Sequence, residues 1–150
     1  MSDDVQKVIL QLPASAEYVD IVRLNLYGIA SKMGFTYEDI EDMKVAVSEA
    51  CNNSVLYAYG QKDGLVDVIF EVGESSLSIT VKDEGESFDG LDKSSERMTL
   101  HDKELSDAQV GGLGFYLMQA LMDDVSVVSE AGKGTVVTLK KHLNFSEEKV

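Results

Sequence analysis

The chain has 150 residues, enough for one domain spanning residues 1–150, and its apolar fraction of 44% is ordinary for a globular protein. The net charge of −14 argues against direct contact with nucleic acid or anionic membrane, because phosphate groups would be repelled. It favours a basic protein partner, or a ligand whose anionic groups are screened by a metal and by backbone N–H groups. Solubility alone also explains such a charge.

The sequence shows no pattern typical of secretion or membrane insertion. Cys51 is the single cysteine, so no intrachain disulfide is possible, and with two histidines a zinc site is not expected. No apolar run approaches the roughly 18 residues of a membrane span. The segment 1–4 lacks the basic and apolar regions of a signal peptide. We therefore expect a cytoplasmic protein.

The N-terminal part predicts a strand followed by a helix. Residues 5–12 have strand composition with alternating apolar side chains, and Pro13 ends the strand. Ser15 is expected to cap a helix that runs to Met33, with Gly34 as its stop.

The stretch from Thr36 to Gly60 predicts one long helix, with Thr36 as N-cap and Gly60 as stop. Residues at helical spacing form a core seam: Ile40, Met43, Val47, Ala50, Cys51, Ser54 and Val55. A second stripe is expected to lie well away from that seam: Asp42, Ala46, Glu49 and Asn53. Glu49 and Asn53 are four apart, so they are neighbours that suit a divalent cation or a proton to be moved. A solvated helix face is the alternative.

The elements predicted next are, in chain order, a hairpin of residues 65–72 and 77–82, a loop at 86–110, a helix at 115–122, and a hairpin of residues 125–129 and 135–139. A long loop without regular structure in a compact domain is typical of a lid over a ligand, or else of a tolerated insertion.

This element order predicts an α+β, two-layer sandwich. Its sheet is expected to be mixed but mostly antiparallel, because hairpins dominate, with helices covering one face. The regular alternation of strand and helix that marks a doubly wound parallel fold is absent from the prediction.

Three further motifs carry polar or glycine-rich chemistry beside the Glu49–Asn53 pair. Asp83 ends a strand where its carboxylate can accept a bond from an exocyclic amine, and Gly85 allows the backbone to approach a flat ring. The glycines of residues 111–114 expose N–H groups at a helix start, which suits phosphate oxygens. Residues 132–135, Gly-Lys-Gly-Thr, place a hydroxyl near the sheet. Each motif alone is a common turn, whereas their joint order is far more specific.

Together these motifs resemble the N, G1, G2 and terminal boxes of the GHKL (Bergerat-fold) ATPases, which include histidine-kinase catalytic domains. Segments 46–54, 82–89 and 111–118 are more closely similar to the stand-alone anti-sigma-factor serine kinases of the RsbW and SpoIIAB type. The resemblance runs from about Val8 to Lys141, and it implies an ATP lid at about 86–110.

The resemblance implies an ATP-dependent serine protein kinase that uses Mg²⁺ and is also an anti-sigma factor. Such a protein sequesters an alternative sigma factor, phosphorylates a serine of its anti-anti-sigma (STAS-domain) antagonist, and forms a homodimer. Glu49 would be the general base, Asn53 the Mg²⁺ ligand and Arg23 a partner-binding residue. The implied nucleotide-binding residues are Asn53, Asp83, Gly85, Gly112, Leu113, Gly114 and Thr135.

The sequence departs from the family pattern at two places. Residues 86–88 replace the usual second G1 glycine, a variation that suits the anti-sigma branch. The lid region carries few cations to hold a γ-phosphate, which keeps other functions open. One alternative is a nucleotide-dependent binding module with little kinase activity. Another is a related switch kinase of stress signalling, which acts on a scaffold without holding sigma. Arg23 also has the alternative of a solvated helix arginine.

Overall fold

The computed structural model describes residues 5–53, 64–84, 113–130 and 134–143. The predicted lid at 86–110 lies outside these residues, as do Gly60, Gly85 and Gly112. The described elements are β1 (Gln6–Pro13), the 3₁₀ helix η1 (Ala16–Tyr18), α1 (Val19–Met33), α2 (Tyr37–Asn53), β2 (Leu65–Val72), β3 (Ser76–Asp83), α6 (Leu113–Leu121), β4 (Asp124–Glu130) and β5 (Gly134–His142).

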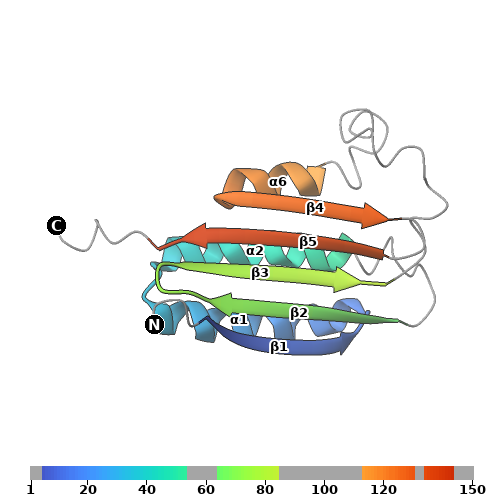
Figure 1. Ribbon diagram of the computed structural model, residues 1–150, viewed down its shortest axis with the longest axis horizontal. Helices are drawn as coiled ribbons and strands as arrows, with labels where there is room; N and C mark the ends of the chain where they lie inside the picture. The colour runs from blue at the N-terminus through green and yellow to red at the C-terminus, as the bar shows by residue number, and fades with distance from the viewer. Residues whose placement is uncertain (1–4, 54–63, 85–112, 131–133, 144–150) are drawn as a thin grey trace.

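The strands form one five-stranded sheet in the order β1-β2-β3-β5-β4. Every pair of neighbouring strands is antiparallel, so the predicted mixed character is not seen among the described strands. The pairs β2–β3 and β4–β5 join strands that are consecutive in the chain, as the predicted hairpins require. Figure 1 shows α1, α2 and α6 on one face of this sheet. The predicted two-layer α+β architecture is confirmed.

The core lies between the sheet and the helices. Alternate side chains of the central strands are buried there: Val66, Val68, Phe70, Leu77, Ile79, Val81, Val137 and Leu139. The helices contribute their apolar stripes, which include Val22, Leu26, Ala30, Met43, Val47, Ala50 and Met118. Burying each larger side chain contributes about 1.5–3 kcal/mol, so this alternation fixes which face of each strand meets the helices.

The start of α1 corrects the sequence prediction. Ser15 makes no side-chain cap bond, and a 3₁₀ turn precedes the helix, which begins at Val19. The carbonyl of Ser15 instead accepts the N–H of Tyr18 at 3.0 Å. The predicted end is confirmed, because Gly34 adopts φ = 100° and donates its N–H to the carbonyl of Ala30.

Helix α2 begins as predicted, with the Asp39 N–H donating to Thr36 Oγ1 at 3.1 Å. The described part of its core seam is buried, from Ile40 to Cys51, while residues 54 and 55 lie outside the described residues. The second stripe was predicted to lie well away from the core, and this prediction is wrong for Ala46. Ala46 is fully buried, because α6 packs against α2 on that side.

Several element ends meet at one edge of the sheet. The C-terminal ends of α2 and β3 and the N-terminal ends of α6 and β5 all lie on the right side of Figure 1. The tight turn between β2 and β3, where Gly73 N–H donates to the carbonyl of Ser76, lies at the opposite end. Among the described helices, none combines the length and apolarity needed to cross a membrane.

Candidate functional site

The predicted pair Glu49 and Asn53 lies against the first turn of α6. Gly114 is buried, and a Cβ atom at that position would lie 2.9 Å from Glu49 Oε1 and 3.7 Å from Asn53 Nδ2. A gap of 2.9 Å is too short for a real Cβ, so glycine lets the α6 backbone reach this carboxylate. The structure therefore brings Gly114 next to Glu49 and Asn53, although about sixty residues separate Gly114 from this pair in the sequence.

This contact is set by the packing of the helix on the core. Met118 on α6 and Met122 directly after its end are buried, while Tyr116 on α6 is exposed. Burial of the methionines fixes the rotation of α6, and its N-terminal turn then faces α2. The backbone N–H groups of this first turn have no partner within the helix, so they favour negative charge nearby.

The predicted residues Asp83 and Thr135 form a second group, where β3 pairs with β5. They occupy opposite positions in the antiparallel register, and both are buried, with 3% and 7% of their surfaces exposed. The Thr135 hydroxyl lies 3.3 Å from that of Ser129 on β4. Polar groups with so little exposure are uncommon in a core, and they mark this strand end as chemically distinct.

Gly134 belongs to this second group and is a candidate site residue to which the sequence prediction gave no role. It adopts φ = 100°, and a Cβ atom there would lie 1.9 Å from the carbonyl oxygen of Asp83. Only glycine fits this position. The signal was present in the Gly-Lys-Gly-Thr motif, but pattern reasoning assigned a role only to the threonine hydroxyl.

Both groups lie at the edge of the sheet where α2, β3, α6 and β5 meet (Figure 1). Leu113 opens α6 at this edge. Gly85 and Gly112 are outside the described residues. In the sequence, Gly85 directly follows the described segment 64–84, and Gly112 directly precedes the described segment 113–130. The described residues contain no group of three or more His, Cys, Asp or Glu side chains that could hold a metal by itself.

Arg23 is not the solvated or simply exposed side chain that the sequence suggested. Its Nη1 donates to Ser48 Oγ on α2 at 2.9 Å, and its Nη2 donates to the Asp20 carboxylate. The side chain is 36% exposed. Helical periodicity does not show such a bond, because it depends on how α1 packs against α2.

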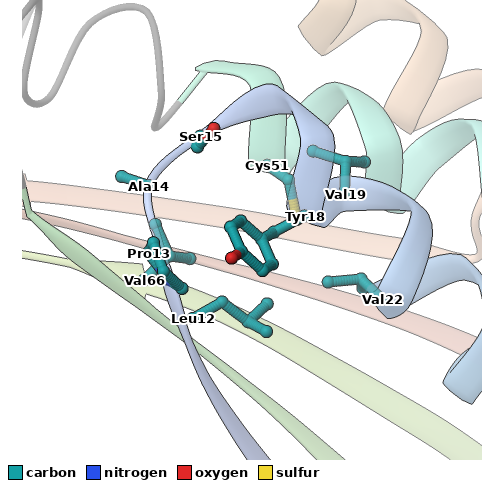
Figure 2. Close-up of a pocket in the computed structure, with 9 residues that line it drawn as sticks. All are labelled: Leu12, Pro13, Ala14, Ser15, Tyr18, Val19, Val22, Cys51 and Val66. Carbon is teal, nitrogen blue, oxygen red and sulfur yellow. The ribbon is translucent and has the colours of Figure 1, made fainter.

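A small apolar pocket lies at the start of α1, on the other side of α2 from α6. Figure 2 shows its lining, which includes Pro13, Tyr18 and Cys51. None of the lining side chains is charged, so this pocket does not suit a triphosphate. Burial raises the pKa of the Cys51 thiol to about 12, an effect partly opposed by the Arg23 charge. Cys51 is therefore a core residue, as predicted.

The chain matches the family described as the histidine kinase-like ATPase domain over residues 12–141. It is 46% identical over 147 residues to the serine-protein kinase RsbW of Bacillus velezensis, covering 96% of this chain and 90% of that protein. The identity is 44% over 147 residues for RsbW of Bacillus subtilis, with the same two coverages, and 49% over 138 residues for RsbW of Bacillus licheniformis, covering 90% and 84%.

A solved structure shares the fold. The crystal structure of the RsbU and RsbW domains of Rv1364c from Mycobacterium tuberculosis matches with a TM-score of 0.66 at 21% identity. The match covers 92% of this chain and 32% of that one, so this chain spans about a third of the solved protein. This likeness supports the described arrangement of sheet and helices.

Proposed function

This chain belongs to the RsbW family of serine-protein kinases, which carry a histidine kinase-like ATPase domain, and on that premise we propose that its four motifs form one Mg²⁺-ATP site serving a partner serine. The observation that carries the proposal is the contact at Gly114, where the α6 backbone lies against Glu49 and Asn53. A carboxylate and a carboxamide beside a helix N-terminus suit the transfer of a phosphoryl group.

Phosphoryl transfer needs positioning and charge neutralisation more than covalent help from the protein. In this proposal the Glu49 carboxylate accepts the proton of the incoming serine hydroxyl, as a general base. The first turn of α6, with Leu113, Gly114 and the preceding Gly112, directs backbone N–H groups at phosphate oxygens. Gly114 brings that turn close enough for the base and the phosphates to share one site.

The residues present suit Mg²⁺, although the described ones would not hold it alone. Mg²⁺ prefers oxygen donors and keeps several phosphate oxygens and waters when it serves ATP. Asn53 offers an amide oxygen as the protein ligand, and the Glu49 carboxylate is its neighbour on α2. When bound, the ion would neutralise phosphate charge, which matters in a chain with a net charge of −14.

The adenine end belongs to the second group. The Asp83 carboxylate would accept a hydrogen bond from the adenine amino group, and the Thr135 hydroxyl would support that contact from β5. Gly85 would leave room for the ring. The close approach of Gly134 to the Asp83 backbone supports this assignment, because it fixes the strand end against which a base would lie.

The partners in this proposal are an alternative sigma factor, which the protein sequesters, and an anti-anti-sigma (STAS-domain) protein, which it phosphorylates. Arg23 lies on α1 near Ile21 and Leu24, which are 39% and 70% exposed, so this helix offers apolar surface and a cation together. The acidic charge complements a basic sigma factor. We also propose a cytoplasmic homodimer.

The first prediction tests the base. Glu49→Gln should lower the rate of partner-serine phosphorylation by about 10²- to 10⁴-fold, the usual contribution of a general base. The Mg²⁺-ATP affinity should change by less than about threefold, since the side-chain shape is kept. Mass spectrometry of the partner gives the rate, and titration calorimetry gives the affinity.

Glu38→Gln is the matched control, because Glu38 is an exposed acid in the first turn of the same helix. It should leave both quantities unchanged. If Glu49→Gln labels the partner at the wild-type rate, Glu49 is not the base. If the wild-type protein binds Mg²⁺-ATP but labels no partner serine, the nucleotide only controls a binding surface. Co-purification of a sigma factor separates the anti-sigma function from that of a scaffold-directed switch kinase.

A further inference from the structure

Ser48 has both of its hydrogen-bonding functions committed. Its hydroxyl donates to the carbonyl oxygen of Lys44 at 2.7 Å and accepts the bond from Arg23 Nη1 at 2.9 Å. A hydroxyl has a single proton, so this pair of bonds fixes its orientation. The Arg23 guanidinium is itself held by Asp20 on the same helix. The result is a continuous polar link from α1 into the backbone of α2.

A serine at this position is not explained by helix formation. Serine lowers helix propensity, and a hydroxyl that bonds to the carbonyl four residues earlier tends to bend a helix slightly. Alanine would fill a half-buried helix position with better propensity. The polar link therefore acts between α1 and α2, and not on the stability of α2 alone.

That link ends one residue before Glu49. Successive helix residues point about 100° apart, so Ser48 faces α1 while Glu49 faces α6 and Gly114. Helix α2 packs against both α1 and α6, and Figure 1 shows it between them. A small rotation of α2 at Ser48 would therefore move the Glu49 carboxylate relative to the first turn of α6, beside which it lies.

We propose that Ser48 is a positioning residue, which uses its hydrogen bond with Arg23 to hold α2 in the rotation that places Glu49 for catalysis. This inference rests on the proposed role of Glu49 as general base. Arg23 then has an intramolecular duty in addition to any contact with a partner. Displacement of the reacting groups by about 1 Å costs on the order of a hundredfold in rate. Loss of the single bond between Arg23 and Ser48 would therefore measurably lower the rate of phosphorylation.

The kinetic test compares Ser48→Ala with Ser48→Thr, which keeps a hydroxyl. Ser48→Ala should lower kcat for partner-serine phosphorylation by about 10- to 100-fold, with the KM for ATP changed by less than about threefold. Ser48→Thr should restore most of kcat. Ser31→Ala, an exposed serine on α1, is the matched control and should match the wild-type protein.

A double-mutant cycle identifies the bond itself. If Arg23 and Ser48 act through one hydrogen bond, Arg23→Gln and Ser48→Ala together should lower kcat no more than the more damaging single change. If the double variant lowers kcat by the product of the two single effects, the proposal is overturned. A wild-type kcat in Ser48→Ala, or a fall in ATP affinity as large as the fall in kcat, would also overturn it.

A spectroscopic test does not depend on kinase activity. The ¹³C signal of the Glu49 side-chain carboxyl should shift in Ser48→Ala and return in Ser48→Thr, while Ser31→Ala leaves it in place. An unmoved signal in folded Ser48→Ala overturns the proposal. If Ser48→Ala does not fold, the same signal is followed in Arg23→Gln. If the wild-type protein phosphorylates no partner but the signal shifts, the positioning of Glu49 stands and its assigned chemistry fails.

Discussion

Gly114 and Gly28 are both helical glycines, but their surroundings are opposite. A Cβ atom at Gly114 would lie 2.9 Å from the Glu49 carboxylate, whereas a Cβ atom at Gly28 on α1 would meet nothing within 4 Å. The sequence alone does not separate the two residues, because glycine is unfavourable in either helix. A side chain at position 114 would have to displace the Glu49 carboxylate, whereas one at position 28 would displace nothing.

Gly114→Ala should therefore weaken Mg²⁺-ADP binding by at least about tenfold, since the Glu49 side chain or the α6 backbone must shift. Titration calorimetry measures the affinity. Gly28→Ala is the matched control, and it should leave the affinity unchanged while raising the free energy of unfolding by about 0.5–1 kcal/mol. Equal affinities for the two variants would remove Gly114 from the site.

Cys51 gives a pH-dependent prediction at the same scale. Its pKa is about 12 when folded against an ordinary value of 9.0, so above pH 9 the unfolded chain binds fewer protons than the folded one. Its contribution to stability is complete below pH 9 and falls by about 1.4 kcal/mol per pH unit until about pH 12.

Urea unfolding of Cys51→Ala provides the measurement, because this variant lacks the titrating thiol. The stability gap between wild type and variant should narrow from pH 9 to pH 11. A gap that is constant across this range would show that the thiol titrates at its ordinary pKa in the folded protein.

At the scale of the elements, α2 links the Glu49–Asn53 group to both neighbouring helices. It bonds to α1 through Ser48, faces α6 through Glu49 and carries Asn53 at the end of its described part. Its first turn is fixed by the Thr36 hydroxyl, which accepts the Asp39 N–H. Loss of order at the C-terminal end of α2, where Glu49 and Asn53 lie, would therefore move the carboxylate that we propose as the general base.

Thr36→Ala should lower the free energy of unfolding by about 1 kcal/mol, the usual value of an N-cap. Because Thr36 is exposed and lies more than three helical turns from Glu49, nucleotide affinity should not change. Thermal unfolding followed by circular dichroism measures the first quantity, and Thr36→Ser should preserve it. A destabilisation equal in Thr36→Ala and Thr36→Ser would show that the hydroxyl is not the cause.

Strand and helix positions were largely predictable, because period-2 and period-3.6 patterns are local. Residues 65–72 were predicted with the observed bounds of β2, and Thr36 was predicted as the cap. The failures depend on packing between elements. Ala46 was assigned to an outer stripe because α6 could not be placed over it, and the bond of Arg23 to Ser48 joins two helices.

At the scale of the whole molecule, two described groups of site residues lie at one edge of an antiparallel sheet (Figure 1). The order of motifs predicted that they act together, and the strand register and the Gly114 approach explain how each group forms. The chain as a whole carries a net charge of −14. That charge acts on partners at long range, and its effect depends on salt.

Association with a basic sigma factor should slow by about tenfold or more between 50 and 500 mM NaCl, because screening removes electrostatic steering. The dissociation rate should change much less. Stopped-flow fluorescence measures both rates, and circular dichroism at each salt concentration confirms that the protein stays folded. An association rate that does not respond to salt would mean that the acidic charge serves solubility alone.

The turn between β2 and β3 lies at the opposite end of the sheet from the C-terminal ends of α2 and β3 and the N-terminal ends of α6 and β5 (Figure 1), and Glu74 within it is exposed. Cys51 is buried and its thiol stays protonated at neutral pH, so it reacts slowly with maleimides. A new cysteine at position 74 would therefore be labelled selectively. A dye attached there would report partner binding and release through its rotational freedom while leaving the proposed site untouched.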